Sequence, residues 1–364
     1  MDKYSGTTLT IDLNSIRKNY LIIKSKVAVS CAVSAVLKAD AYGIGVKHVA
    51  PALELAGCNV IFVANIDEAL EIQPLLNGSS SVYVLHGAHT KELIDLCNNR
   101  KIHLVLNNLE QVKLFNKFSH GINAILHIDT GMNRLGISEL DLYHLISEGA
   151  LPKVEYIMSH LSSSEVKEAS SNRLQLDLIN KYRAKLGGIK VSLANSAGIF
   201  LGEEYHFDMV RPGCALYGIS HKICEVGLLE HSISLDAHII QKRIIIEDQS
   251  VGYGGKYIAK AGSKLFTLDI GYADGYPRSL SNKGKAFIAG YLLDIVGVIS
   301  MDSMVVDATV LPESIFNNAT HVELIGRNIS IDAVSLLAGA SGYELIASKL
   351  GHRFKRVYID VPQC

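Results

Sequence analysis

Several features are missing from this sequence, and each absence excludes a class of protein. No apolar stretch approaches the ~20 residues that a membrane-spanning helix needs, and the N-terminal letters MDKYSGTTLTIDL lack the apolar core of a secretory signal. Basic residues form no long block and the net charge is −1, so we expect neither nucleic acid nor a membrane as a partner. The six cysteines form no C-x-x-C pair and show no zinc-like spacing, which predicts reduced thiols, no bound metal and a cytoplasmic location.

Between residues 31 and 218, short apolar runs alternate with stretches of helical spacing such as GVKHVAPALELAG and TKELIDLCNN. Near-continuous apolar strands between helices are typical of a parallel sheet that is buried on both faces. Because eight such runs occur, we predict a closed α/β structure, a (β/α)8 TIM-type barrel. The gap from 198 to 208 is short for a full helix. The runs are CAVSAVLKA (31–39), NVIFVAN (59–65), SVYVLHG (81–87), IHLVLNN (102–108), AILHIDTG (124–131), VEYIMSHLS (154–162), KVSLANSAG (190–198) and DMVRPGCALYG (208–218).

After about residue 231 the pattern changes to short strands separated by turn residues, without helices between them. This pattern predicts a smaller, mostly antiparallel β-rich C-terminal domain. Near the end, IDAVSLLAGASGYELIASKLG predicts one or two short helices before a last strand, KRVYID. We therefore expect a barrel domain over 8–231 and a β-rich domain over 232–364. The second domain would also include the N-terminal strand, which we expect at residues 1–7.

Polar residues recur where the apolar runs end. In a (β/α)8 barrel these positions share the C-terminal rim, where barrel enzymes place their chemistry. A single polar residue at a strand end carries little information, but a full set on one rim predicts a site. The set comprises Lys38, His86, Asn107, Asp129, His160, Asn195 with Ser196, and Arg211.

Lys38 has two interpretations. A lysine at a strand end commonly extends its ammonium to solvent, but a partly buried amine with a lowered pKa is suited to form a Schiff base. The segments ANSAG (194–198) and RPG (211–213) follow the last two runs, where barrels build phosphate sites. An amine and a phosphate site on one rim predict pyridoxal 5′-phosphate (PLP), with Arg211 as partner of the pyridine nitrogen. The chain has neither a GxGxxG fingerprint nor a Walker lysine that would favour a nucleotide.

Eight segments in order resemble the successive motifs of the alanine racemase family, essentially along the whole chain. The resemblance implies a PLP-dependent homodimer that interconverts L- and D-alanine and supplies D-alanine for peptidoglycan. The segments are VLKADAYGIG, HIDTGMNRLG, MSHLSSSE, LANSAG, MVRPGCALYG, VGYGGKY, IGYADGYPR and SMDSMVVD.

The resemblance also implies a role for each matching residue. Lys38 and Tyr253 would be the two catalytic bases, with Tyr253 presented by the partner subunit. Arg134 and the backbone of Met301 would contact the substrate. Residues that would line or brace the entrance are Glu165, Tyr272 and Asp302. Residues that would bind the cofactor are Lys38, Tyr42, His160, Asn195, Ser196, Arg211, Gly213, Cys214 and Tyr343.

The chain departs from the family pattern at a few positions. His127 stands where many members carry a carbamylated lysine, whose negative charge orients the arginine that matches Arg134. We therefore expect another group, such as a bound anion, to orient Arg134 in this chain. Val298 replaces an entrance arginine, and Ser341 with Gly342 replaces a bulkier pair. These changes leave a serine or broad-specificity racemase as an alternative. A PLP-binding homeostasis protein without catalysis is the non-enzyme alternative, although the β-rich domain and Tyr253 argue against it.

Overall fold

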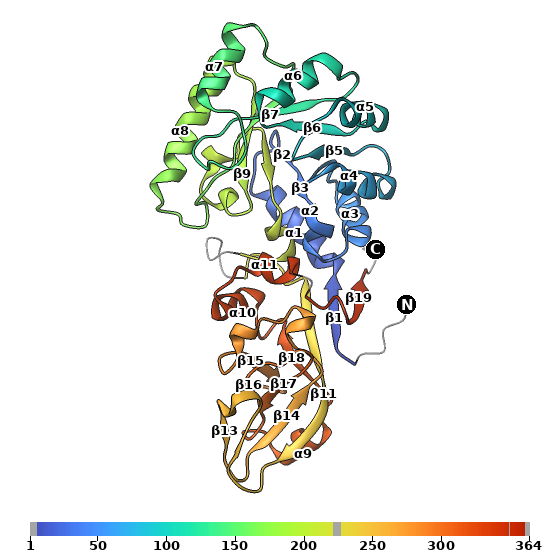
Figure 1. Ribbon diagram of the computed structural model, residues 1–364, viewed down its shortest axis with the longest axis vertical. Coiled ribbons are helices and arrows are strands. Elements are labelled where there is room, and N and C mark those ends of the chain that lie inside the picture. Colours follow the sequence, from blue (N-terminus) through green and yellow to red (C-terminus); the bar gives the residue numbers. More distant parts are fainter. Residues whose placement is uncertain (1–5, 221–226, 349, 361–364) are drawn as a thin grey trace. The chain divides into compact units, whose positions relative to one another are not determined.

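The structure consists of two compact units. The computed structural model describes residues 6–220, 227–348 and 350–360. The larger unit is formed mainly by Ile16–Leu216, and the smaller one mainly by residues 6–15 and 230–360. We call them the barrel unit and the β unit (Figure 1).

The barrel unit contains one sheet of parallel strand segments. They are β2 (Ala32–Val33), β3 (Ala35–Val36), β4 (Val60–Val63), β5 (Ser81–Val84), β6 (His103–Leu106), β7 (Ala124–His127), β8 (Tyr156–Met158), β9 (Lys190–Asn195) and β10 (Met209–Arg211). The first predicted run supplies both β2, which pairs with β10, and β3, which pairs with β4. Between them, Ser34 donates to the Val210 carbonyl from its amide (3.0 Å) and its hydroxyl (2.9 Å). This one strand therefore joins both edges of the sheet, and the predicted eight-stranded barrel is confirmed.

Side chains fill the interior of the barrel. Strands β3 to β8 and β10 each send at least one buried residue into a single cluster, as expected for a packed core rather than a pore. A ligand therefore has no room inside the barrel and would bind at one of its rims. The cluster is formed by Val36, Phe62, Tyr83, Val105, Ile125, Tyr156, Met158 and Met209.

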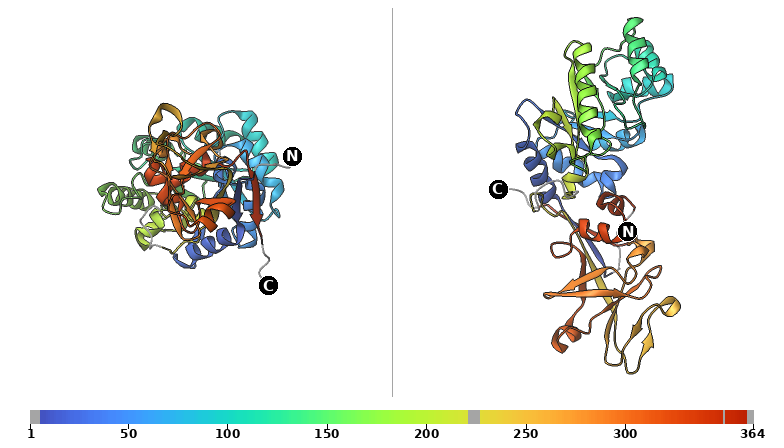
Figure 2. Two further views of the ribbon diagram at one scale, coloured as in Figure 1. Left: turned by 90° about the horizontal axis from the view of Figure 1, so that it is seen from below. Right: turned by 90° about the vertical axis from the view of Figure 1, so that its left-hand side faces the viewer.

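Helices lie outside the strands of the barrel unit (Figures 1 and 2). They are α1 (Leu13–Ser25), α3 (Val46–Leu55), α4 (Ile66–Ile72), α5 (Lys91–Arg100), α6 (Leu109–Phe118), α7 (Glu139–Ser147) and α8 (Ser170–Lys185). Only two short 3-10 turns, η2 (Gly198–Phe200) and η3 (Glu203–Tyr205), connect β9 to β10, as the short gap predicted. Across the described ranges, none of the helices combines the length and apolarity that a bilayer span requires.

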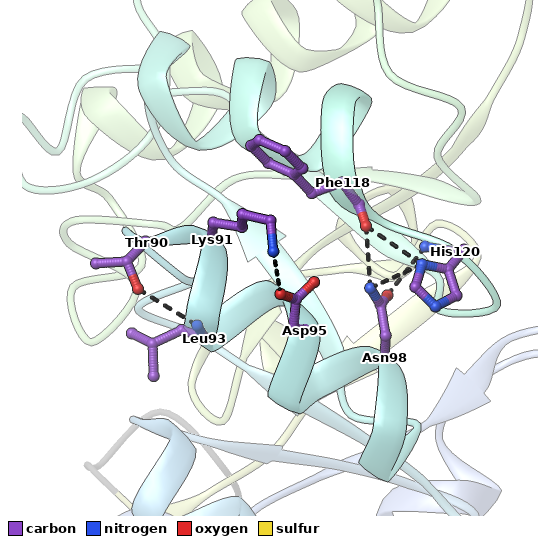
Figure 3. A network of polar contacts seen from close by, with 7 residues as sticks. All are labelled: Thr90, Lys91, Leu93, Asp95, Asn98, Phe118 and His120. Atoms are coloured by element: carbon purple, nitrogen blue, oxygen red, sulfur yellow. Dashed lines mark hydrogen bonds and ion pairs between the residues drawn. The ribbon is translucent and has the colours of Figure 1, made fainter.

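Polar contacts tie neighbouring outer helices together, as α5 and α6 illustrate (Figure 3). Asn98, near the end of α5, donates to the carbonyl of Phe118 at the end of α6 (3.0 Å). The Asn98 side chain also accepts from the amide of His120 (2.9 Å). Thr90 caps the other end of α5 by accepting from the Leu93 amide (3.3 Å). These bonds satisfy backbone groups that a helix end leaves free.

The β unit is built on strands that close into a ring. The sheet order is β14-β17-β16-β15-β18-β11, and an additional pairing of β11 with β14 completes the circle. All of these pairings are antiparallel, as predicted. The strands are β11 (Ile233–Ile244), β14 (Lys264–Leu268), β15 (Lys285–Ile288), β16 (Tyr291–Val296), β17 (Met304–Asp307) and β18 (His321–Ile325).

Segments from both ends of the chain complete the β unit. Strand β1 (Thr8–Asp12) pairs antiparallel with β11 and parallel with β19 (Lys355–Ile359). The N-terminal strand was expected at 1–7, with the barrel beginning at residue 8; the pairing of β1 instead places residues 8–15 with the β unit. The β unit also contains the hairpin strands β12 (Gln249–Ser250) and β13 (Ile258–Ala259), several 3-10 turns, and the short helices α9 (Glu313–Asn318), α10 (Ile331–Ala338) and α11 (Gly342–Ala347).

Candidate active site

The polar residues that the sequence placed at strand ends do lie at the ends of the barrel strands. Lys38 comes two residues after β3 and His160 two residues after β8, while Asn195 and Arg211 are the last residues of β9 and β10. Because the strands run parallel, these ends share one rim. His86, Asn107 and Asp129 follow β5, β6 and β7 at the same rim.

Lys38 opens a turn of unusual handedness, α2 (Lys38–Tyr42). The next four residues all have positive φ angles between 53° and 59°, although none of them is glycine. Such residues cost about 1–2 kcal/mol each in this conformation. The Asp40 carboxylate stabilises the turn by accepting from the Val46 amide (2.7 Å), which begins α3. The surrounding structure therefore determines how the backbone leaves Lys38.

The environment of Lys38 lowers the pKa of its amine. The side chain is half-buried, and burial is the main reason that its pKa is lowered. The positive charge of Arg134 lowers the pKa further, while Glu68 and Cys214 oppose the shift. A less protonated amine is the form that attacks a carbonyl carbon.

Arg211 is a buried cation with neutral partners. Its guanidinium donates to the Ser192 hydroxyl (2.6 Å) and to the Ser159 carbonyl (2.6 Å). It also lies 3.4 Å from Nδ1 of His160, which must act as the acceptor because arginine only donates. Burial lowers the pKa of Arg211 to about 10, so it stays charged at neutral pH. Burial and Arg211 hold the pKa of His160 well below its usual range, so this ring is neutral.

Ser196, Gly213 and Tyr42 form a compact cradle on the rim. The Ser196 hydroxyl oxygen accepts from the amides of Gly213 (2.9 Å) and Ala215 (3.2 Å), at the start of η4 (Cys214–Tyr217). A Cβ atom on Gly213 would lie 2.2 Å from the Tyr42 hydroxyl. The Ser196 and Tyr42 hydroxyl groups therefore both lie beside the Gly213 backbone, an arrangement suited to the oxygens of an anion.

Asn195, Cys214 and Glu165 surround this cradle. The Asn195 side-chain oxygen accepts from the Ser164 hydroxyl (2.8 Å) and the Gly198 amide (2.9 Å), so it braces the loops beside it. Burial raises the pKa of the Cys214 thiol to about 12, and the Glu165 charge contributes to the shift. The thiol is therefore protonated at neutral pH and cannot act as a thiolate nucleophile.

Arg134 lies on a loop that Asp129 holds in shape. The Asp129 carboxylate accepts from the amides of Gly131 (2.9 Å), Met132 (2.9 Å) and Asn133 (3.0 Å). The Arg134 side chain is exposed, and its positive charge lowers the pKa of Lys38.

His127 is buried at the end of β7. Its Nδ1 atom lies 2.8 Å from the Asn107 side-chain oxygen. Burial, with the nearby Arg211, lowers its pKa to about 3. A neutral imidazole provides no negative charge that would orient Arg134.

The remaining candidate residues belong to the β unit. Tyr272 begins η6 (Tyr272–Asp274), and its amide donates to the Ser300 carbonyl (3.0 Å). The Ala273 amide donates to Met301 (2.8 Å), so Tyr272, Met301 and Asp302 lie on two joined loops. Tyr253 lies on η5 (Tyr253–Gly255) with 71% of its surface exposed, and Tyr343 lies on α11.

Most of the residues that support the rim carry little signal in the sequence. Ser159 and Ser192 hold Arg211, yet both are ordinary polar residues in apolar runs. Asn107 was expected on the rim, but nothing in the sequence indicated that its side chain contacts His127. Glu68 accepts a hydrogen bond from the backbone amide of Ala39, next to Lys38. Its only signal was the Asn65-x-x-Glu68 spacing, which predicts a helix cap and nothing more.

Comparisons with known proteins cover both units. Family models described as "Alanine racemase, N-terminal domain" and "Alanine racemase, C-terminal domain" match residues 11–221 and 232–358. The alanine racemase of Rickettsia canadensis is 38% identical over 358 residues, which cover 96% of this chain and 98% of that protein. The alanine racemase of Brucella suis is 39% identical over 380 residues, covering 99% and 95%.

Solved structures give the same result. Alanine racemase from Bartonella henselae, solved with covalently bound pyridoxal phosphate, matches with a TM-score of 0.89 and 38% identity, covering 97% of this chain and 99% of that one. Biosynthetic alanine racemase from Pseudomonas aeruginosa matches with a TM-score of 0.88 and 31% identity, covering 98% and 100%. This chain therefore belongs to the alanine racemase family.

Proposed function

We propose that this protein is a PLP-dependent alanine racemase that interconverts L- and D-alanine with two bases on opposite faces of the substrate. One observation carries the proposal. A half-buried lysine with a lowered pKa shares a rim with a buried arginine that has neutral partners, and with a hydroxyl-lined cradle. The full-length similarity to alanine racemases supports the same activity.

The rim residues fit PLP. Lys38 would bind the cofactor aldehyde, and Arg211 would face the pyridine nitrogen with His160 beside it. The cradle that a Cβ on Gly213 would fill suits the phosphate. Asn195 would brace this end of the site. The phosphate would be held by Tyr42, Ser196, Gly213, the Cys214 amide and Tyr343.

Racemisation needs a proton to leave one face of the substrate and another to arrive on the opposite face. When bound, PLP supplies the electron sink that makes the α-proton acidic. The Lys38 amine would accept or return the proton on one face. The hydroxyl of Tyr253 of the partner subunit would do so on the other. The high exposure of Tyr253 supports this role, because a side chain that serves a second chain cannot be buried in its own unit.

Charged and backbone groups would hold the amino acid between these bases. Arg134 would pair with the substrate carboxylate, helped by the Met301 backbone, and Glu165, Tyr272 and Asp302 would line or brace the entrance. Asp129 supports the assignment of Arg134, because its three backbone bonds give the loop a defined shape.

The assembly and setting belong to the same proposal. Two chains would form a homodimer with shared sites, because Tyr253 serves a second chain. We place the enzyme in the cytoplasm, where it would supply D-alanine for peptidoglycan.

The first experiment incubates the PLP-loaded protein with L-alanine in heavy water. We expect α-proton exchange by NMR together with D-alanine by chiral chromatography. L-Serine in a parallel reaction tests the broader specificity that Val298, Ser341 and Gly342 suggested. Exchange without D-alanine, or turnover of serine alone, would contradict alanine racemisation.

Lys38→Ala provides the matched control for the site. Without the amine, we expect loss of both turnover and the absorbance of covalently attached PLP, because no other rim group replaces it. Retained absorbance with retained turnover would remove Lys38 from its assigned role, whatever the substrate.

A further inference from the structure

Glu68 is partly buried and makes specific contacts beside Lys38, yet no role above uses it. It lies in the first turn of α4, where Asn65 caps the helix by accepting from the Glu68 amide (2.9 Å). A carboxylate at this position is also favoured by the helix dipole. The cap therefore holds the backbone of Glu68 in place.

The carboxylate of Glu68 connects two neighbouring strand ends. One oxygen accepts from the amide of Ala39 (2.8 Å), the residue directly after Lys38. The other accepts from the amide of Ala64 (2.7 Å), directly after β4. Strands β3 and β4 already pair through Val36 and Phe62, so Glu68 extends their connection into the turn.

This bond falls where the backbone needs support. Ala39 is the first of the four residues with positive φ, and its amide is the first backbone donor after Lys38. A conformation that is costly for each residue persists only when its surroundings impose it. Glu68 restrains the start of the turn, and Asp40 restrains its junction with α3.

We propose that Glu68 is the positioning residue for Lys38: its carboxylate fixes the left-handed turn that aims the lysine, and its charge acts on the lysine nitrogen. The proposal rests on the assigned role of Lys38. Its electrostatic part agrees with the sign of the Glu68 contribution, which raises the pKa of Lys38 against the lowering effect of burial.

Only a carboxylate satisfies both amides. Each oxygen of Glu68 accepts one N–H bond, whereas a glutamine has one accepting oxygen and an NH2 group that donates. In Glu68→Gln the NH2 group would face a backbone N–H, and the negative charge would be lost. In Glu68→Asp the charge would remain, but the side chain would be too short to bridge both strand ends.

The test uses the PLP-loaded enzyme, and its readouts are kcat/KM and the pH titration of cofactor absorbance. We expect Glu68→Gln to reduce kcat/KM on the order of tenfold to a hundredfold, because small misplacements of a reacting group have effects of that size. The titration midpoint should move to lower pH, since removing a negative charge destabilises the protonated nitrogen. Glu68→Asp should reduce kcat/KM while leaving the midpoint close to that of the parent.

Glu71→Gln is the matched control, because Glu71 is exposed on the same helix and loses the same charge. It should change neither readout. Parent-like values of both readouts in Glu68→Gln would overturn the proposal, as would equal shifts in Glu71→Gln. Thermal unfolding of each variant identifies general destabilisation, which cannot by itself shift the titration midpoint of the folded enzyme.

The Lys38→Ala variant separates the two proposals. If Lys38→Ala keeps its PLP absorbance, the assignment of Lys38 fails. If it loses the absorbance while Glu68→Gln matches the parent, only the Glu68 proposal fails.

Discussion

At the scale of single residues, contacts explain what residue type alone does not. The sequence analysis placed Gly213 among the residues that would bind the cofactor, and the structure identifies the group that occupies the space beside it. The Tyr42 hydroxyl would lie 2.2 Å from an added Cβ, well inside any real contact. A larger residue at this position is opposed by the crowding and not by a positive φ angle.

We expect Gly213→Ala to weaken PLP binding about tenfold or more, because overpacking of this kind costs about 1–3 kcal/mol. Adding Tyr42→Phe removes the clashing oxygen and should recover part of the loss. Titration of PLP into the parent, both single variants and the double variant gives the coupling between the two sites. Strictly additive effects would show that the contact is not what excludes alanine.

At the scale of elements, the strands and outer helices follow from their patterns, but the turn after Lys38 does not. The letters KADAY contain good helix formers, and propensity alone favours a right-handed helix there. Residues distant in sequence instead impose the left-handed form, since Glu68 bonds to the turn across 29 positions. Backbone handedness at this point is decided by contacts that the local sequence does not contain.

Ala39→Gly should stabilise the protein by about 1 kcal/mol, because glycine adopts a positive φ without the steric cost that alanine has. Ala184→Gly, on the exposed face of α8, is the control. In an ordinary right-handed helix the same change should destabilise by about 1 kcal/mol. Thermal unfolding of both variants checks the opposite signs, and shifts in the same direction would contradict the strained turn.

At the scale of the whole molecule, the candidate residues divide between the units. The barrel unit contains Lys38 with all of the proposed cofactor groups except Tyr343, while the β unit contains Tyr253, Tyr343 and the joined loops of Tyr272 and Met301. The two family models match the same two regions of the chain. Under the proposed function, a chain alone has an incomplete site.

Mixing two inactive variants tests this division. Lys38→Ala and Tyr253→Phe should each be nearly inactive, but dimers that contain one chain of each kind would have one intact site. Random pairing then restores about a quarter of the parent activity, because half of the dimers are mixed and each has one working site of two. Co-expressed, separately tagged chains and chiral detection of D-alanine make the measurement. Mixed dimers without activity would place Lys38 and Tyr253 of one chain in the same site.

The sequence by itself determined the eight-stranded barrel, the antiparallel second unit and the rim positions of Lys38, His160 and Arg211. Periodicity and strand ends are local properties, and parallel strands bring their ends together wherever a barrel closes. The tertiary structure alone decided that Ser34 joins the two edges of the sheet, that Arg211 has neutral partners, and that Glu68 restrains the turn beside Lys38. These features depend on contacts between residues far apart in the chain, and no local pattern encodes such contacts.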